Sequence, residues 1–370
     1  MNRMIKATQP VMPKLEDYIQ EISSIWNTGI MTNNGEKVDK LKKMLLAYTK
    51  CNNIDLFVNG HSALMIAIKA LGLQGEAITS PFTFVSTTNA IVQNGLIPVF
   101  GDIDDSYNLS PDTIEELITN KTSAIITPHI FGIPCDVEKI EQIAKKHNLK
   151  VIYDGAQAFG TKVKGTDISC FGDITMFSLH AIKVFNSIEG GLLSYHDKTL
   201  HKTFELLRNF GISYGEFGSD VDDIGMNAKM NEFQAAMGIV NLPELDNEIK
   251  KRKKLAEKYC ECLNDIPGIQ TYTYCKDIDY NYAYFPIKVT EEYGITRDKL
   301  WIKLKEQGIG TRKLYDKLTC DYRCYKDAGY TRKTEYADKV KEMALDLPMY
   351  GTLTEEDIYF ICETIKGLRK

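Results

Sequence analysis

The chain has 370 residues, of which 44% are hydrophobic and 26% are charged, and its formal net charge is −5. This composition is typical of a folded globular protein and excludes a disordered chain. No basic stripe stands out beyond short runs such as residues 250–254, which excludes nucleic-acid binding through a basic surface. The length predicts one large domain and a smaller one.

The start of the chain leads into a polar stretch, and the longest apolar runs are only as long as strands. We therefore expect neither a signal peptide nor a membrane-spanning helix. The nine cysteines are scattered, without a C-x-x-C pair or a zinc-like Cys/His spacing. These features predict a cytoplasmic protein with reduced thiols, no metal site, and no nucleic-acid or membrane partner.

The first fifty residues are expected to form a helical arm that ends in a turn at Asn33-Asn34-Gly35. Strand-like segments then alternate with helical ones, in which apolar residues recur at i, i+3, i+4 and i+7. The strands are short and mostly apolar, as when helices cover both faces of a mainly parallel sheet. They are predicted at residues 54–58, 77–80, 97–100, 123–127, 150–154, 174–178 and 191–195.

After this sheet the pattern changes. A long charged helix is predicted at 232–263 with a break near Pro243, then a strand at 282–289 and a helix at 297–307. Thr354 is expected to cap the last helix. The predicted domains are an N-terminal helical arm at 1–50, a large α/β domain at 51–245, and a connecting helix with a small C-terminal α+β domain at 246–370.

Several polar residues directly follow predicted strands, which is where open α/β sheets place ligands. Asn59-Gly60-His61-Ser62 joins a strand to a helix. The amides at such a helix start suit a phosphate, although a glycine there is often only conformational. Asp154 ends another strand, where it can keep a pyridinium nitrogen protonated or simply cap a helix.

Lys183 lies five residues after Ser178, so the two side chains can share one cavity, in which Ser178 can hydrogen-bond a phosphate. A Schiff base requires a primary amine, and the lysine released from it can act as a base. Taken alone, a lysine is usually a surface residue. Phe84 can stack on a planar ring or belong to the core, and Asn227 can donate from its amide or merely mark a helix start.

Taken together in chain order, these segments resemble the DegT/DnrJ/StrS type of sugar-nucleotide aminotransferases, which are fold-type-I pyridoxal phosphate enzymes. The resemblance covers nearly the whole chain. It implies an aspartate-aminotransferase-like α/β large domain with a mostly parallel sheet, and a smaller α+β C-terminal domain. Further segments that carry it are residues 81–87, 98–104, 129–132, 189–191, 225–230 and 347–350.

The resemblance also implies roles for matching positions. Lys183 matches the lysine that holds pyridoxal 5′-phosphate and moves protons, Asp154 the carboxylate at the pyridine nitrogen, and Gln157 the side chain beside the ring hydroxyl. Phe84 matches the aromatic residue on the ring face. Gly60, His61, Ser62 and Ser178 match the phosphate cup, in which His61 departs from the common threonine. Asn227 matches a residue supplied by the other subunit, which implies a homodimer with shared active sites.

Because Lys183 is present where some relatives have histidine, the resemblance favours transamination, with glutamate as donor and pyridoxamine phosphate as intermediate. The run from Lys183 to Gly191 is most similar to enzymes that aminate dTDP-4-keto-6-deoxyglucose at C4. The implied product is dTDP-4-amino-4,6-dideoxyglucose or its galactose epimer, a precursor of surface polysaccharides such as O-antigen. Sugar contacts are expected from His180, Tyr214 and Tyr315.

Other interpretations remain. The substrate can be another keto-sugar nucleotide, with the keto group at C3 or with a UDP or GDP carrier. A non-catalytic regulatory relative would be expected to have lost the lysine, aspartate or serine, and all three are present. A nicotinamide oxidoreductase is disfavoured because no G-x-G-x-x-G follows the first strand.

Overall fold

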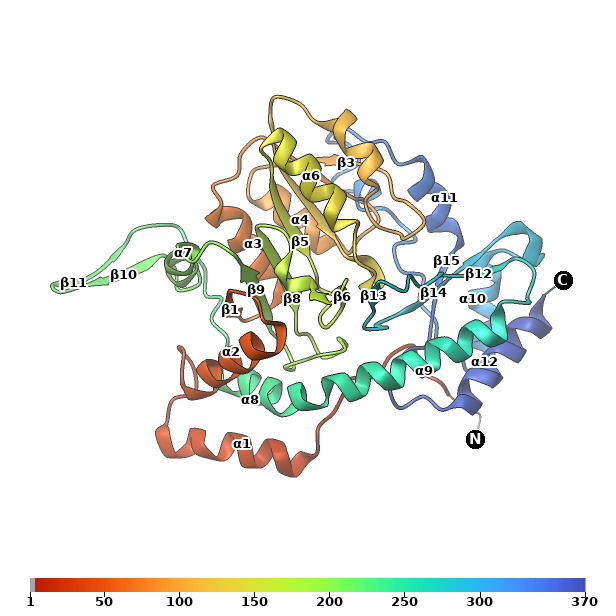
Figure 1. The fold of residues 1–370 in the computed structure, drawn as a ribbon, viewed down its shortest axis with the longest axis horizontal. Helices are drawn as coiled ribbons and strands as arrows, with labels where there is room; N and C mark the ends of the chain where they lie inside the picture. The colour runs from red at the N-terminus through yellow and green to blue at the C-terminus, as the bar shows by residue number, and fades with distance from the viewer. Residues whose placement is uncertain (1–3, 370) are drawn as a thin grey trace.

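The computed structural model describes residues 4–369. Its larger part is a seven-stranded sheet with helices on both faces, in the strand order β1-β9-β8-β5-β4-β2-β3 (Figure 1). The predicted strands are confirmed, each to within one residue at either end. They are β1 (Asn53–Phe57), β2 (Glu76–Thr79), β3 (Ile97–Phe100), β4 (Thr122–Pro128), β5 (Lys150–Asp154), β8 (Ile174–Ser178) and β9 (Gly191–Tyr195).

Most of this sheet is parallel, as predicted. Strands β3, β2, β4, β5 and β8 pair in parallel, whereas β9 is antiparallel to both β8 and β1. The carboxyl ends of β5 and β8 therefore lie side by side at one edge of the sheet. That edge is where a doubly covered α/β sheet leaves room for a ligand.

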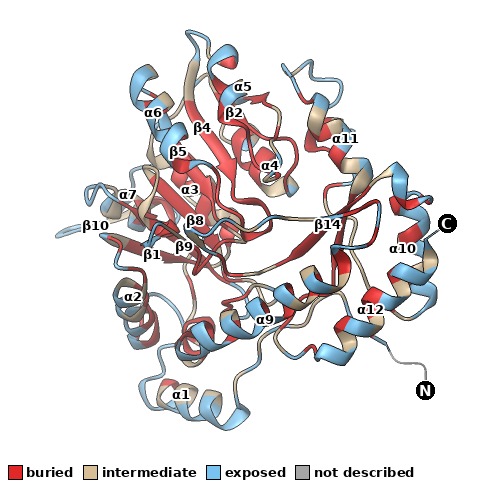
Figure 2. Ribbon diagram, turned by 45° about the vertical axis from the view of Figure 1, so that its right-hand side comes forward, coloured by how far each residue is buried: buried red, intermediate tan, exposed pale blue. Residues whose placement is uncertain are grey.

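Successive residues of these strands fill two separate cores, because side chains alternate between the faces of a sheet. Ile125 and Val151 belong to one core, and Ala124 and Ile152 to the other. Figure 2 shows the buried strands between more exposed helices. The first core includes α2 (Glu36–Thr49), α6 (Val137–His147) and α8 (Glu232–Asn241); the second includes α3 (Gly60–Ala70), α4 (Val85–Gln93) and α7 (Leu200–Leu207).

The helical segment predicted at 232–263 is divided into two helices at the break predicted near Pro243. A 3-10 turn at Leu242–Glu244 separates α8 from α9 (Leu245–Leu263). Pro243 lies in this turn and has no N–H to continue a helical ladder. Helix α9 then leads from the large sheet toward the C-terminal part of the chain (Figure 1).

A second, three-stranded sheet has its own core in the C-terminal part. The predicted strand there begins at Phe285 rather than at Tyr282, because Tyr282 has a φ of 51°, outside the extended region. Thr354 caps the last helix as predicted, and it forms a capping box with Asp357. The elements are β12 (Ile269–Thr271), β14 (Phe285–Val289), β15 (Ala344–Leu347), α10 (Arg297–Glu306) and α12 (Glu355–Leu368).

The N-terminal arm is helical, but the predicted turn connects two helices instead of ending the arm. Asn33 and Asn34 both have positive φ angles and lie between α1 (Leu15–Thr28) and α2. A buried carboxylate accepts hydrogen bonds from backbone amides in the first turn of α2. Glu232 accepts from the Lys37 amide at 2.7 Å and from the Val38 amide at 3.1 Å. This contact joins the arm to α8.

One prominent element was not predicted from the sequence. The hairpin of β10 (Ile212–Gly215) and β11 (Gly218–Val221) projects from the body of the molecule (Figure 1). The remaining α-helices and strands are α5 (Pro111–Ile114), α11 (Glu335–Met343), and a small sheet of β6 (Lys162–Val163), β7 (Thr166–Asp167) and β13 (Ile278–Asp279). Among residues 4–369, no helix is long and apolar enough to cross a membrane.

Candidate active site

A cavity of about 370 Å³ lies where the carboxyl ends of β5 and β8 meet the first turns of α3 and α4. The C-terminal part of the chain closes one side of it with Tyr284, Arg312 and Tyr315. Most of the predicted site residues line this one cavity. They are Gly60, His61, Phe84, Asp154, Gln157, Ser178, His180, Lys183 and Tyr315.

Asp154 is buried at the end of β5, and two groups fix its carboxylate. Thr87 donates to Oδ2 at 2.7 Å, and the Ala156 amide donates to Oδ1 at 3.1 Å. Thr87 has a single hydroxyl proton, so the 3.1 Å contact between the Thr83 and Thr87 hydroxyls requires Thr83 to donate. Burial raises the pKa of the Asp154 carboxyl, and the hydrogen bonds counteract this only in part.

The start of α3 forms a cradle next to β8. A Cβ atom added at Gly60 would lie 3.0 Å from the Cβ of Ser178, so a larger residue would push the helix start away from β8. Asn59 caps the helix by accepting from the Ser62 amide at 2.8 Å. The amides of Gly60 and His61 have no hydrogen-bond partner within the described chain. Two free amides at a helix start and a nearby hydroxyl fit a phosphate group.

Lys183 lies in the loop between β8 and β9, which backbone hydrogen bonds hold in place. The Leu179 amide donates to the Gly190 carbonyl at 2.8 Å, and the Lys183 amide to the His180 carbonyl at 2.9 Å. The amine of Lys183 makes no ion pair or hydrogen bond with any residue of the 4–369 segment, although it lines the cavity with Asp154. A lysine held in a cavity without an ionic partner is available for chemistry.

Gln157 links the two parts of the chain across the cavity. Its Oε1 accepts from the Phe131 amide at 2.6 Å, and its Nε2 donates to the Tyr315 hydroxyl at 2.5 Å. Tyr315 has a φ of 62°, which a tyrosine rarely adopts, so the surrounding structure must hold it there. These bonds fix the orientation of the Gln157 amide at the cavity wall.

Phe84 and His61 also line the cavity. Phe84 is 65% exposed, which excludes the alternative interpretation that it is a core residue. His61 Nδ1 lies 2.8 Å from the Ser86 hydroxyl, and this contact fixes the plane of the imidazole ring. His61 thus remains in the wall with its ring oriented, in the position where threonine was expected.

Three predicted site residues do not line the cavity of their own chain. Ser62 already uses its amide for the helix cap. Asn227 accepts a hydrogen bond from the Lys229 amine at 3.0 Å, outside the cavity. Tyr214 lies on the projecting hairpin and is 76% exposed. The roles of all three residues stay predictions.

Sequence reasoning missed Thr87, Ser86 and Arg312, which all take part in the site. Thr83 and Thr87 lie on either side of a predicted strand-to-helix junction, and two hydroxyls so close to Asp154's edge of the sheet were an available signal. Nothing local distinguishes Arg312 from a surface arginine. Its role depends on a contact with Asp346, which is 34 residues away in the sequence.

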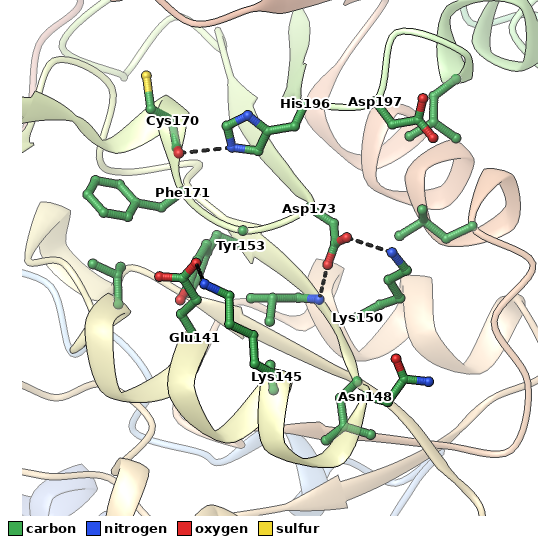
Figure 3. A pocket seen from close by; sticks show the side chains of 17 residues that line it. Glu141, Lys145, Asn148, Lys150, Tyr153, Cys170, Phe171, Asp173, His196 and Asp197 are labelled. Carbon is green, nitrogen blue, oxygen red and sulfur yellow. Dashed lines mark hydrogen bonds and ion pairs between the residues drawn. The ribbon is translucent and has the colours of Figure 1, made fainter.

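A larger groove of about 690 Å³ lies elsewhere, near the end of α6 and the amino-terminal end of β5 (Figure 3). Its charged groups pair with each other, as in the contacts Lys150–Asp173 at 2.7 Å and Lys145–Glu141 at 2.6 Å. Its histidine, His196, contacts the Cys170 carbonyl at 3.1 Å. The smaller cavity with its unpaired lysine is therefore the better candidate for catalysis.

An unpaired lysine, a buried carboxylate and a phosphate cradle at one edge of an α/β sheet suit an enzyme that holds a phosphate-bearing carbonyl cofactor on a lysine. The chain belongs to the DegT/DnrJ/EryC1/StrS aminotransferase family, whose model matches residues 14–366. This confirms the family expected from the sequence.

Full-length relatives and solved structures agree with this assignment. The chain is 37% identical to a dTDP-4-amino-4,6-dideoxy-D-glucose transaminase of Shigella dysenteriae, over 100% of both proteins. It is 30% identical to a GDP-perosamine synthase of Escherichia coli O157:H7, over 98% of both. The crystal structure of DesI in the presence of its TDP-sugar product superposes with a TM-score of 0.92 at 27% identity, covering 99% of this chain and 93% of that one.

Proposed function

We propose that this enzyme transfers an amino group from glutamate to C4 of dTDP-4-keto-6-deoxyglucose, giving dTDP-4-amino-4,6-dideoxyglucose, with pyridoxal 5′-phosphate held by Lys183. The observation that carries the proposal is the full-length match to a transaminase named for this product. The GDP-perosamine synthase is also matched over nearly its full length, but at lower identity. A dTDP carrier is therefore favoured over a GDP carrier.

The cavity fits the cofactor at each of its polar groups. The Gly60 and His61 amides and the Ser178 hydroxyl suit its phosphate. Asp154 suits the ring nitrogen, and Gln157 the ring hydroxyl. When bound, pyridoxal phosphate supplies a carbonyl that takes up the amino group and a ring that withdraws electrons from the reacting carbon.

Lys183 and Asp154 perform the protein's part of the chemistry. The Lys183 amine is a nucleophile when deprotonated, and once free of the cofactor it takes a proton from the amine-bearing carbon of the donor. In the sugar half-reaction the same amine returns a proton to C4. Asp154 keeps the ring nitrogen protonated, because a buried carboxylate favours a cationic partner.

The proposal is tested by incubating the purified enzyme with glutamate, pyridoxal phosphate and dTDP-4-keto-6-deoxyglucose, and identifying the product by NMR. We expect a sugar aminated at C4. The 3-keto isomer and the GDP-linked 4-keto-6-deoxymannose serve as competing substrates. Faster amination of either competitor would contradict the proposed substrate.

Thr87 is expected to act by positioning Asp154. In a Thr87→Val variant the carboxylate loses its hydroxyl donor, and we expect kcat to fall by about tenfold to a hundredfold, because a buried hydrogen-bond partner is lost. A Thr87→Ser variant should retain most activity. The measurements are kcat and the pH dependence of the cofactor's absorbance.

Thr88→Val is the matched control for this experiment. Thr88 is also buried and also donates to a hydroxyl, that of Thr319 at 2.8 Å, but it has no contact with Asp154. If Thr87→Val and Thr88→Val change kcat and the cofactor's pH dependence equally, the effect is one of packing and Thr87 does not position Asp154.

The active site is proposed to be shared between two subunits of a homodimer. Asn227 lies outside the cavity of its own chain, so it can reach a phosphate only from a second copy. The hairpin presents Tyr214 and Phe217 to solvent, and Phe217 is 98% exposed. A projecting hairpin with exposed aromatic rings suits an interface with another subunit.

Mixing two inactive variants tests this arrangement. Lys183→Ala removes the lysine, and Asn227→Asp places a negative charge beside the phosphate. If each site takes Lys183 from one subunit and Asn227 from the other, mixed dimers contain one intact site, and an equal mixture should recover about a quarter of wild-type activity. Recovery of no activity from exchanged subunits would show that both residues serve the same chain's site.

A further inference from the structure

His61 belongs to the phosphate cradle and presents a free edge of its ring to the cavity. It lies in the first turn of α3, and its backbone amide is one of the two that have no partner in the described chain. Its Nδ1 lies 2.8 Å from the hydroxyl of Ser86, in the first turn of α4. Its Nε2 has no hydrogen-bond partner among residues 4–369. The imidazole is therefore held through one nitrogen and can bind a ligand through the other.

Most of the other basic side chains of the cavity are neutral or already paired. In the described chain the basic side chains that line it are His61, His129, His180, Lys183 and Arg312. Burial lowers the pKa of His129 to about 3, so this ring stays neutral. His180 Nε2 lies 3.4 Å from Glu189 Oε1, and Arg312 Nη2 donates to Asp346 Oδ2 at 2.7 Å. Only two of the five side chains remain without a partner that fixes their charge.

The first of these two, Lys183, is needed elsewhere, because its amine holds the cofactor's carbonyl in the proposed reaction. The other is His61, which makes no ion pair within the part of the chain that the structure describes. The remaining donors of the cradle, the backbone amides and the Ser178 hydroxyl, are neutral. A phosphate monoester carries about 1.5 to 2 negative charges at neutral pH. His61 is therefore the side chain that can bring positive charge to this phosphate.

Ser86 allows the ring to act in both of its protonation states. A hydroxyl can donate as well as accept, so Ser86 can donate to a neutral Nδ1 or accept from a protonated one. In both states Nε2 carries a hydrogen that can be donated to a phosphate oxygen. Histidine side chains ordinarily take up a proton between about pH 8 and pH 5, and a charged donor makes a hydrogen bond about twice as strong as a neutral one.

We propose that the His61 imidazole binds the cofactor's phosphate through Nε2 and makes the affinity for the cofactor pH-dependent, with Ser86 as the residue that positions the ring. This inference rests on the proposed use of pyridoxal phosphate. At low pH the imidazolium strengthens binding, and as the pH rises the ring loses its proton and only a neutral hydrogen bond remains. The phosphate itself takes up a proton below about pH 6, so the gain is largest just above that pH.

Other groups in the cavity also titrate, so the effect of His61 has to be measured as a difference between variants. Burial raises the pKa of Asp154, and hydrogen bonds together with the charges of Lys183 and His61 lower it in part. His61 and Asp154 are thus within electrostatic reach of each other. The remaining ionisable side chains that line the cavity are His129, His180, Glu189, Tyr284, Arg312 and Tyr315.

The test measures how tightly the cofactor-free enzyme binds pyridoxine 5′-phosphate, which has no carbonyl and cannot form an imine with Lys183. Dissociation constants are determined near pH 6 and near pH 8.5. A His61→Gln variant keeps an N–H donor but cannot become charged. We expect its affinity to be about tenfold below that of wild type near pH 6, and less than about threefold below it near pH 8.5. Ser86→Ala should show the same pattern with a smaller loss, because the ring remains but is no longer oriented.

Two controls make the result specific to this ring and to the phosphate. His180→Gln removes another histidine of the same cavity, one that faces Glu189, and it should keep the pH dependence of wild type. Pyridoxine, which lacks the phosphate, is the matched ligand. Wild type and His61→Gln should bind pyridoxine equally at each pH.

Each other outcome overturns the inference. The same pH dependence in wild type and His61→Gln would exclude a charged His61 at the phosphate and would leave the proposed cofactor intact. An equal loss of affinity for pyridoxine would place the ring against the pyridine instead. A pH dependence that disappears in His180→Gln alone would belong to that residue. If wild type binds pyridoxine phosphate no more tightly than pyridoxine, the phosphate cradle and the proposed cofactor fail together with the inference.

Discussion

A Lys183→Ala variant is expected to lose turnover by about 10⁴-fold or more, because one amine is both the nucleophile and the proton carrier. The loss should affect both half-reactions, since the same amine serves both. The fold should survive, because the Lys183 amine makes no hydrogen bond or ion pair within residues 4–369. Single-turnover kinetics with glutamate measures the effect.

Borohydride reduction of the wild-type holoenzyme, followed by peptide mapping, provides the companion measurement. The cofactor's mass should appear on the peptide that contains Lys183. Lys229 is the informative alternative, because it is a second lysine in a segment that resembles the family pattern, but its amine is occupied by Asn209 at 2.8 Å. Cofactor on any peptide other than that of Lys183 would contradict the assignment.

An Asp154→Asn variant is expected to lower kcat by about 10³-fold, because removing the charge on one side of a buried ion pair costs about 3–5 kcal/mol. The amide retains the size of the side chain and an oxygen that can accept from Thr87. Cofactor should still bind, through the phosphate cradle, but its ring nitrogen should lose its proton. The measurements are kcat and the absorbance spectrum of the bound cofactor. A variant with wild-type kcat would exclude Asp154 as the partner of the ring nitrogen.

The same variant has a stability signature. Because burial raises the pKa of Asp154, the protonated carboxyl stabilises the cofactor-free protein at low pH, and this contribution is lost as the pH rises through the raised pKa. At neutral pH the cofactor-free Asn variant should therefore unfold at the same denaturant concentration as wild type or a higher one. Thermal or denaturant unfolding at two pH values separates this effect from the catalytic one.

Much of the sheet could be predicted because its signals are local. Residues 150–154 and 174–178 are apolar runs followed by polar or glycine-rich turns, and both strands have the predicted bounds. The polar residues after them, Asp154 and Ser178, then had to meet at the same edge of a parallel sheet. No local signal predicted that β9 is antiparallel to its neighbours, because an apolar strand has the same sequence pattern in parallel and antiparallel pairing.

The rest depended on contacts that no local pattern encodes. Thr87 and Asp154 are 67 residues apart, and Gln157 and Tyr315 are 158 apart, so the support of the site follows only from the fold. The hairpin of β10 and β11 is fully exposed at its tip and lacks the alternation that reveals a half-buried strand. The domain boundaries and the cross-subunit role of Asn227 remain predictions.

The most direct test of the central claim is the absorbance spectrum of the purified protein with pyridoxal phosphate, recorded before and after glutamate and again after dTDP-4-keto-6-deoxyglucose. The account predicts a lysine-linked band in the visible region that glutamate removes and the keto-sugar restores. If glutamate leaves the band unchanged, or if no such band forms, this chain does not carry an amino group between the two substrates.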